Sequence, residues 1–208
     1  MGWVSTKLEE CTRQQSEAQV SGDLEIGQMI PGKGIFMGVW EAKNRRGKSL
    51  GKKFRRFVAP EDLMDDEGKK VLWTFREAAQ QVAGLRNWHG HDGADFKDEA
   101  DFYKALKEGR GIGKWFIPPS EFLIGIDRNG DKVSDDHLYA HSARGNLKGT
   151  FATAEDSGRG FWYGSCTEPA RLPSFVWAAC FLTGDDGWTS KTVGRLNFRP
   201  FRLEELVP

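Results

Sequence analysis

Apolar residues recur at helical spacing in the middle of the chain. Thr74 and Glu77 have the spacing of a capping box, in which each side chain satisfies an unpaired backbone donor of the first helical turn. The apolar residues that follow share one face: Phe75, Ala78, Ala79, Val82 and Leu85. The pattern predicts a helix over residues 74–86.

Two shorter helices are predicted after it. Residues 97–108 end at Gly109, and their apolar side consists of Phe102, Ala105 and Leu106. Ser120 is placed to cap a third helix over residues 121–126.

Strand patterns lie toward both ends of the chain. Residues 35–40 alternate, with Ile35, Met37 and Val39 on one face, and residues 54–58 follow as a returning strand. Three further runs of strand length are residues 161–166, 175–182 and 196–202, and the turn 184–187 leads to another strand near Trp188. Helices in the middle and strands at both ends predict an α+β fold in which the two ends meet in one sheet.

The patterning is dense from residue 24 to 203, so we predict one domain over residues 23–208. Residues 1–22 are mostly polar and are predicted to form an N-terminal arm. Val4, Leu8 and Cys11 permit a short amphipathic helix there, which is either a frayed terminus packed on its own domain or a docking element.

Charge and hydropathy narrow the function classes. Lysine plus arginine and aspartate plus glutamate number 30 each, so no basic excess points to nucleic acid. No apolar run has the roughly 20 residues that span a bilayer, and no signal-peptide core is present. We therefore expect synthesis in the cytoplasm, which a component of a phage particle would share. Zero net charge also favours association, and a homo-oligomer is expected.

Six blocks of the sequence resemble, in order, those of one family. They are residues 26–38 around Pro31–Gly32, 74–91 ending in His-Gly-His, 114–122 with Lys-Trp-Phe-Ile-Pro-Pro-Ser-Glu-Phe, 145–151 with Gly-Asn-Leu-Lys-Gly-Thr-Phe, 161–168 with Phe-Trp-Tyr-Gly-Ser-Cys-Thr-Glu, and 195–202 with Arg-Leu-Asn-Phe-Arg-Pro-Phe-Arg. Together they resemble the bacterial Lcl C-terminal-domain family, which is related in fold to C-type lectins and sulfatase-modifying factors. The resemblance implies a C-type-lectin-like α+β fold with mixed or antiparallel sheets, two to three short helices and long loops.

The resemblance also implies a non-catalytic module that binds a glycan or a protein, since family members have adhesive roles and occur in surface proteins and phage regions. Three departures from the family pattern stand out. Residues 92–113 look like an insertion, Phe116 replaces an expected arginine, and Gly164 and Cys166 replace a tryptophan and a serine. The inserted segment is a candidate site for a partner of this protein's own.

The candidate ligand-binding residues are aromatic and basic. Four tryptophans, if exposed, would stack on sugar rings or anchor a protein partner: Trp88, Trp115, Trp162 and Trp188. The strongest basic concentration lies in residues 43–56 and includes Arg45, Arg46 and Arg55. It would contact an acidic surface unless it is a solvated hairpin neutralised by the acidic residues 61–67.

Metal binding is the weaker interpretation of two clusters. His89 and His91 carry imidazoles that suit a transition metal, but they fit a turn at a helix end as well. Residues 127–131 begin like a calcium loop, yet the required glycine and glutamate are Lys132 and Leu138. Asp131 and Asp135 are the remaining calcium candidates in what also reads as a solvated acidic loop. We predict no cofactor, with calcium as the alternative.

Catalysis has one candidate. Sulfatase-modifying enzymes use a cysteine pair for oxidation, and Cys166 and Cys180 lie on two predicted strands. Both lie in core-like runs, where a free cysteine behaves as a small hydrophobic residue. The sequence therefore predicts a binding or structural module. The alternatives are a factor that inhibits or decorates an intracellular protein assembly, and an oxidase of the sulfatase-modifying type.

Overall fold

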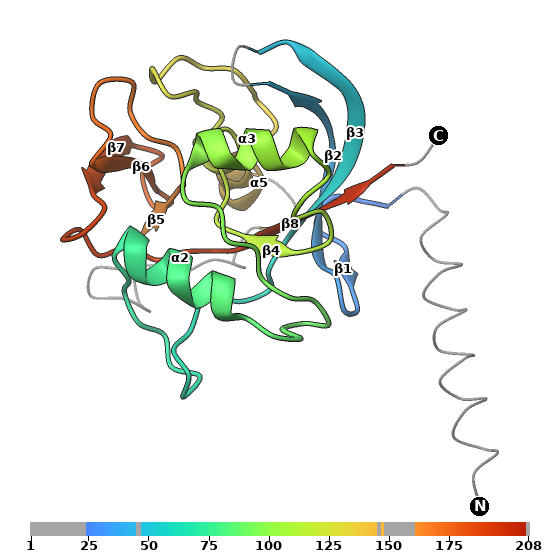
Figure 1. Cartoon of the computed structure of the whole chain (residues 1–208), viewed down its shortest axis with the longest axis horizontal. Helices are drawn as coiled ribbons and strands as arrows, with labels where there is room; N and C mark the ends of the chain where they lie inside the picture. The colour runs from blue at the N-terminus through green and yellow to red at the C-terminus, as the bar shows by residue number, and fades with distance from the viewer. Residues whose placement is uncertain (1–23, 45–46, 145–146, 148–160, 207–208) are drawn as a thin grey trace, which may run out of the picture.

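The computed structural model describes residues 24–44, 47–144, 147 and 161–206. The predicted N-terminal arm lies outside these residues. The described part is an α+β fold with two antiparallel sheets, as the sequence predicted (Figure 1). The described residues contain four helices, where two to three were expected. They are α2 (Phe75–Gly84), α3 (Glu99–Lys107), α4 (Ser120–Ile124) and α5 (Leu138–Arg144).

The larger sheet joins the first and last strands of the described residues. Its strand order is β1 (Met29–Ile30), β2 (Gly34–Lys43), β3 (Ser49–Val58), β8 (Phe201–Glu205), β4 (Trp115–Phe116). Because β8 lies between β3 and β4, the C-terminal strand pairs with an N-terminal hairpin, which confirms the predicted meeting of the ends. The smaller sheet has the order β5 (Trp162–Gly164), β6 (Phe175–Cys180), β7 (Asp186–Ser190).

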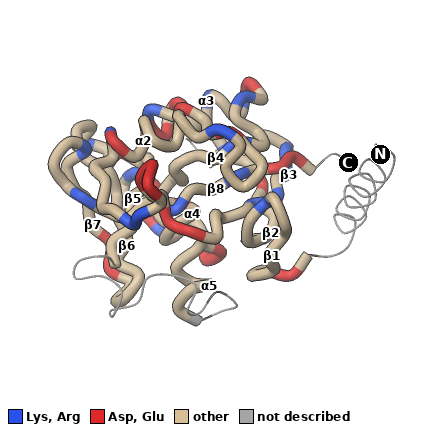
Figure 2. The backbone as a smooth tube through the Cα atoms, turned by 90° about the horizontal axis from the view of Figure 1, so that it is seen from below, with Lys and Arg blue, Asp and Glu red and all other residues tan. Residues whose placement is uncertain are grey.

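The helices cover both sides of the region around β4 and β8. Helices α2 and α3 lie on one side and α5 on the other, with the smaller sheet beside them (Figures 1 and 2). Basic and acidic residues are interspersed over the backbone in Figure 2 rather than separated onto two faces. The described residues contain no helix long and apolar enough to cross a membrane.

Helix α2 forms as its pattern predicts. The Thr74 hydroxyl accepts a hydrogen bond from the Glu77 N–H at 3.3 Å, and a Glu77 carboxylate oxygen accepts one from the Thr74 N–H at 2.8 Å. Phe75, Ala78 and Val82 are then buried. The reciprocal cap removes two unsatisfied donors, so this helix is well specified by local sequence.

The segment 92–113 belongs to the core. Asp98 caps α3, whose Phe102 and Leu106 are buried. Phe102 packs against Phe96 at 5.6 Å and against Phe116 at 5.1 Å between ring centroids. The segment is therefore integrated into the domain's packing and is not an appendage.

Three local predictions are corrected. Val39 was predicted to share a face with Ile35 and Met37, but those two are buried and Val39 is 48% exposed. The β2–β3 register shifts between Phe36 and Val39, and the buried side chain becomes Trp40. Residues 196–200 are not a strand, because Leu196 pairs with Trp73 and Asn197 with Tyr163, so β8 begins only at Phe201.

The third correction concerns α4. Ser120 is its first residue rather than its cap, and the Ser120 hydroxyl donates instead to the Ile126 carbonyl at 2.8 Å. The helix ends at Gly125, which adopts φ 77°.

Candidate functional site

A cavity of about 460 Å³ lies where the β2–β3 hairpin, α3, α4 and the turn after α4 come together. The side chains that define it are mostly polar. They are Lys43, Asn44, Glu99, Tyr103, Glu121, Asp127, Arg128, Asn129 and Val133. A cavity of this volume suits a small organic ligand.

Glu121 forms the buried end of this polar lining. It is 7% exposed because α4 is surrounded by core, and both its carboxylate oxygens accept hydrogen bonds. The Trp40 indole N–H donates at 3.1 Å and the Tyr103 hydroxyl at 3.2 Å. Each carboxylate oxygen has further acceptor capacity, so the group can still receive a donor from a ligand.

Glu99 and Tyr103 come from one face of α3, four residues apart. Glu99 is 5% exposed and accepts a hydrogen bond from the Thr167 hydroxyl at 3.0 Å. Burial raises the pKa of Tyr103, and the negative charges of Glu121 and Glu99 raise it further. The phenol therefore stays protonated and acts as a hydrogen-bond donor to Glu121.

The turn after α4 forms the outer rim. The Asp127 carboxylate accepts hydrogen bonds from the N–H groups of Asn129 at 2.7 Å and Asp131 at 3.1 Å, which fixes the turn. Arg128 donates to the Ala170 carbonyl at 3.0 Å, and its own carbonyl accepts the Trp177 indole N–H at 3.3 Å. The rim is thus tied to the smaller sheet.

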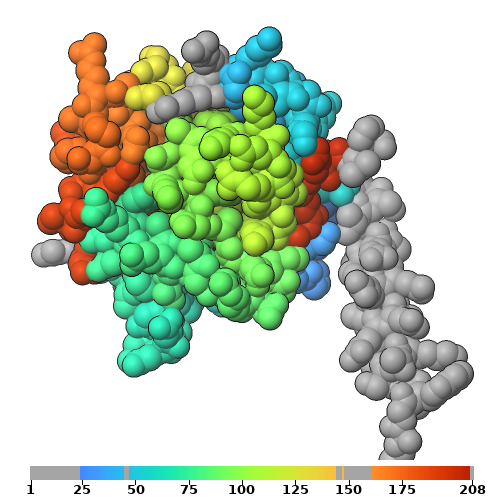
Figure 3. Space-filling model, viewed as in Figure 1, coloured from blue at the N-terminus to red at the C-terminus, as the bar shows by residue number. Residues whose placement is uncertain are grey.

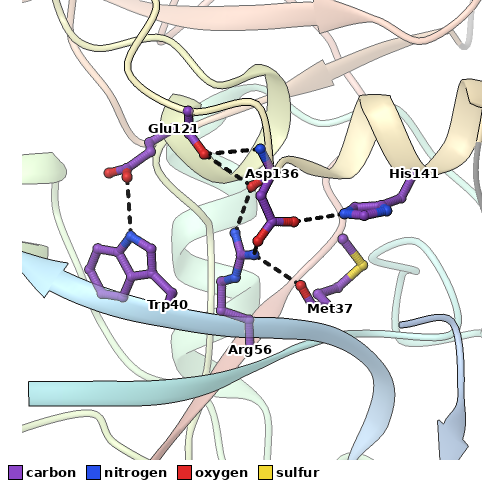
Figure 4. A network of polar contacts seen from close by, with 7 residues as sticks. Met37, Trp40, Arg56, Glu121, Asp136 and His141 are labelled. Atoms are coloured by element: carbon purple, nitrogen blue, oxygen red, sulfur yellow. Dashed lines mark hydrogen bonds and ion pairs between the residues drawn. The ribbon is translucent and has the colours of Figure 1, made fainter. Parts of the chain in front are cut away.

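Behind the cavity, Arg56 anchors a second polar network (Figure 4). This side chain on β3 is 2% exposed. It donates to the Met37 carbonyl at 2.9 Å and the Asp136 carbonyl at 3.0 Å, and it forms an ion pair with the Asp136 carboxylate. His141 of α5 contacts the other Asp136 oxygen at 2.7 Å.

The charges of this network support one another. Burial lowers the pKa of Arg56, and Asp136 and Glu121 oppose that shift. Burial by itself would raise the pKa of Asp136, but the His141 hydrogen bond and the Arg56 charge hold it below its ordinary value. The network therefore joins β2, β3 and α5 through an ionised pair.

The four tryptophans predicted to bind a ligand differ in their exposure to solvent. Trp115 is 0% exposed, so its predicted role as a surface platform is wrong. Although β4 is the edge strand next to β8, the Trp115 ring is covered by Trp88 and His89. Trp88 is half-buried against Trp115, with ring centroids 5.3 Å apart. Trp162 is half-buried on β5, and Trp188 on β7 is 52% exposed.

Trp188 is the tryptophan best placed to contact a ligand. It stands opposite Trp177 in the β6–β7 register and packs edge-on against Phe175 at 5.0 Å. Because Trp177 also binds the Arg128 carbonyl, this aromatic strand pair adjoins the rim of the cavity. Trp88 and Trp115 lie together elsewhere and do not line it.

The basic concentration of residues 43–56 is less exposed than predicted. Arg45 and Arg46 lie outside the described residues. Arg55 is half-buried on β3, and Arg56 points into the core because β3 alternates Phe54, Arg56 and Val58 inward. Neutralisation by the following acidic residues is wrong for Asp62, which is buried and ion-paired with Arg199 at 2.7 Å.

The residues considered as metal ligands lie apart from one another, and each has other contacts. His89 packs on Trp88 at 4.4 Å, and burial together with the charge of Arg202 lowers the pKa of His91. Asp135 is ion-paired with Lys132 and is 89% exposed. Asp131 closes the turn through its N–H to Asp127. Within the described residues, no group of three potential ligands lies close enough to hold a metal ion.

Cys166 and Cys180 are buried and form no disulfide. Cys180 pairs with Trp162, whereas Cys166 lies four residues further along the same chain segment. At about 3.3 Å per residue this is roughly 13 Å along the sheet, well beyond the reach of a disulfide. Burial and the nearby Glu99 also raise the pKa of Cys166, which disfavours the reactive thiolate.

No family model, curated protein or solved structure matches the chain significantly.

The sequence reasoning missed Glu99, Tyr103 and Glu121. One signal was present: Glu99, Phe102 and Leu106 share the apolar face of α3, so a carboxylate was placed on a buried stripe. Glu121 likewise sits inside the apolar run 115–126. A charged residue at a position patterned for the core is a candidate site because its burial requires partners.

Proposed function

We propose that this protein is a non-catalytic binding module for a carbohydrate, with the cavity around Glu99, Tyr103 and Glu121 as its binding site. The main support for this proposal is the buried Glu121 carboxylate, which accepts hydrogen bonds from Trp40 and Tyr103 and lines a cavity of about 460 Å³. Fixed carboxylates are strong acceptors for the hydroxyl groups of a sugar.

The mixture of polar groups favours a hydroxyl-rich ligand over a simple cation. The lining combines the carboxylate acceptors of Glu99 and Glu121 with donors from Lys43, Arg128 and Asn129. A sugar hydroxyl donates one hydrogen bond and accepts others, so it can use both kinds of group. A cation would use only the acceptors.

The exposed ring of Trp188 supports the same ligand class. Aromatic faces pack against the apolar C–H faces of sugar rings, and the aromatic pair on β6 and β7 adjoins the rim through Trp177. A longer glycan would therefore place one residue in the cavity and a neighbouring residue toward Trp188. The antiparallel α+β architecture is compatible with the C-type-lectin-like fold implied by the sequence, and we include that fold in the proposal.

A glycan-array screen followed by calorimetric titration of the strongest glycan tests the proposal. Val133 lines the opening and is 42% exposed, so Val133→Arg should block entry without disturbing the core. We expect the affinity to fall about tenfold or more. Leu182→Arg, at a 58% exposed position outside the cavity, is the matched control and should bind like the wild type.

Two results would overturn the proposal. The first is that no glycan binds, or that Val133→Arg and Leu182→Arg bind the glycan equally well. The second is that the recovered glycan has been cleaved or modified, which would make the protein an enzyme.

A further inference from the structure

A second cavity, of about 550 Å³, lies where α2 meets the segments before α3, before β6 and after β7. Its lining includes Arg76 from the first turn of α2, Lys97 from the segment before α3 and Lys191 from the end of β7. Figure 3 shows the α2 segment beside the orange and red C-terminal segments on this face. The fold thus brings together three cations that are far apart in the sequence.

The cavity has an excess of positive charge. Its lining contains three basic side chains and one acidic side chain, Asp95, which gives a formal charge of +2 (3 − 1). Among the described residues, no ion pair within 4.0 Å is formed by Arg76 or Lys97. Both side chains are exposed, so their hydrogen-bond donors are available to a ligand.

Lys191 is held in place on the cavity wall. Its ammonium group pairs with Glu168 and lies 5.5 Å from the centre of the Phe75 ring. Its carbonyl accepts the Arg76 N–H at 3.2 Å, which fixes the end of β7 against the start of α2. Because Glu168 balances Lys191, the unbalanced charge falls to +1, from Arg76 and Lys97 against Asp95.

The first turn of α2 adds to this field, although two of its backbone donors are already used. The Glu77 N–H is used by Thr74 and the Arg76 N–H by Lys191, so an anion would be bound by side chains. The positive end of the helix dipole still favours negative charge here. Beneath the basic groups, Phe75, Ala79 and Pro173 form an apolar wall.

We propose that this cavity is a second ligand site, specific for a phosphate or sulfate group carried on a small organic molecule. The guanidinium of Arg76 and the ammonium of Lys97 bind the oxyanion through charge-assisted hydrogen bonds. Ser174 and Thr192 provide hydroxyl donors at the rim, and the apolar wall contacts the rest of the ligand. The site is separate from the proposed carbohydrate site and does not depend on it.

Calorimetric titration at low ionic strength tests the site with glucose 6-phosphate and glucose 6-sulfate, with glucose as the neutral comparison. We expect one or both esters to bind and glucose not to bind at this site. Inorganic phosphate or sulfate should compete with the ester of its own kind. The ester that binds more tightly identifies which oxyanion the site selects.

Variants locate the binding. Arg76→Gln combined with Lys97→Gln should weaken ester binding about tenfold or more. Lys107→Gln combined with Lys114→Gln makes the same change in net charge at exposed positions outside the cavity and should leave binding unchanged. Val133→Arg, which blocks the first cavity, should also leave ester binding unchanged.

The proposal is overturned if neither ester binds. It is also overturned if both double variants lose affinity equally, because the effect would then be one of net charge alone. A loss of ester binding in Val133→Arg would assign the ester to the first cavity and would likewise overturn it.

Discussion

A buried guanidinium is stable only where its charge is balanced, and Arg56 is balanced mainly by one carboxylate. The Asp136 side chain is 45% exposed, whereas the Arg56 side chain is 2% exposed. Losing one partner or the other should therefore change the free energy of unfolding by different amounts. Removing the arginine would leave an aspartate that water can solvate. Removing the aspartate would leave a cation inside the core, which costs far more.

Asp136→Asn should therefore destabilise the protein by about 2–4 kcal/mol, somewhat below the cost for a fully buried pair because Arg56 keeps its carbonyl partners. Chemical denaturation measures the change. Asp135→Asn is the matched control, since this neighbour is 89% exposed and its ion pair among the described residues is a surface pair with Lys132. Its free energy of unfolding should change by less than about 0.5 kcal/mol. Equal effects in the two variants would contradict the role of the Arg56 pair.

The pH dependence of stability follows from the same network and from two histidines. Burial lowers the pKa of His137, as do His141 and Lys132, and burial with Arg202 lowers the pKa of His91. As the pH falls below about 6.5, the unfolded chain takes up protons at these sites before the folded protein does. The contribution of these two neutral histidines to stability is thus complete above about pH 6.5. It is lost as the pH falls through their folded-state pKa values.

Denaturation midpoints between about pH 7 and 5 should therefore decrease, and His137→Gln should reduce this decrease. The lowered pKa of Asp136 affects stability at a lower pH than the histidines do. Its contribution is complete above about pH 4 and is lost as the pH falls through the folded-state value, so Asp136→Asn should weaken the acid dependence below pH 4 only. A midpoint that is constant from pH 7 to 5 would contradict the histidine assignment.

At the scale of elements, the end of α4 fixes the rim of the candidate carbohydrate site. Gly125 has φ 77°, and its carbonyl accepts hydrogen bonds from the N–H groups of Val133 at 2.7 Å and Ser134 at 3.1 Å. The chain therefore returns to the helix end after the Asp127–Asp131 turn. A Cβ atom on Gly125 would lie 2.1 Å from the Ser134 carbonyl oxygen, so only glycine fits.

Gly125→Ala should cost about 2–5 kcal/mol, from the left-handed backbone and from the clash together. Gly51→Ala is the control, because Gly51 also has a positive φ of 67° but a Cβ there meets nothing within 4 Å. It should cost only about 1–2 kcal/mol. Thermal or chemical unfolding of both variants separates strain from clash, and equal losses would contradict the close packing of this helix end.

At the scale of the whole molecule, the two sheets share one core. That core includes Tyr163 of β5, Val176 of β6, Phe201 of β8 and Cys166. Cys180 is buried next to Ala179, which also belongs to the core. The cysteines are protected by global packing rather than by a local shield. Their access to solvent should therefore require unfolding of the domain.

A thiol titration of the Cys11→Ser variant tests this protection. We expect Cys166 and Cys180 to react slowly with an aromatic disulfide reagent in the native protein and to react fully in denaturant. Rapid reaction of either thiol without denaturant would contradict the burial. A native reaction that yields an intramolecular disulfide would revive the oxidase alternative.

The sequence by itself determined the features that depend on neighbours along the chain. The capping box of α2, the apolar faces of α2 and α3 and the runs that became β3 and β6 are local patterns, and the structure follows them. The pairing of the chain ends followed from strands at both ends of the chain around a helical middle.

Only the tertiary structure decided which polar residues face inward. Arg56 looks like part of a basic surface loop until the β2–β3 register and the Asp136 carboxylate before α5 enclose it. Trp115 looks like a ligand-binding surface residue until Trp88 and His89 pack against its ring. The carboxylates of the candidate site come from α3 and α4, and only their packing brings Glu99 and Glu121 around Tyr103. The burial of a charge depends on partners distant in sequence, and one sequence does not specify which distant residues meet.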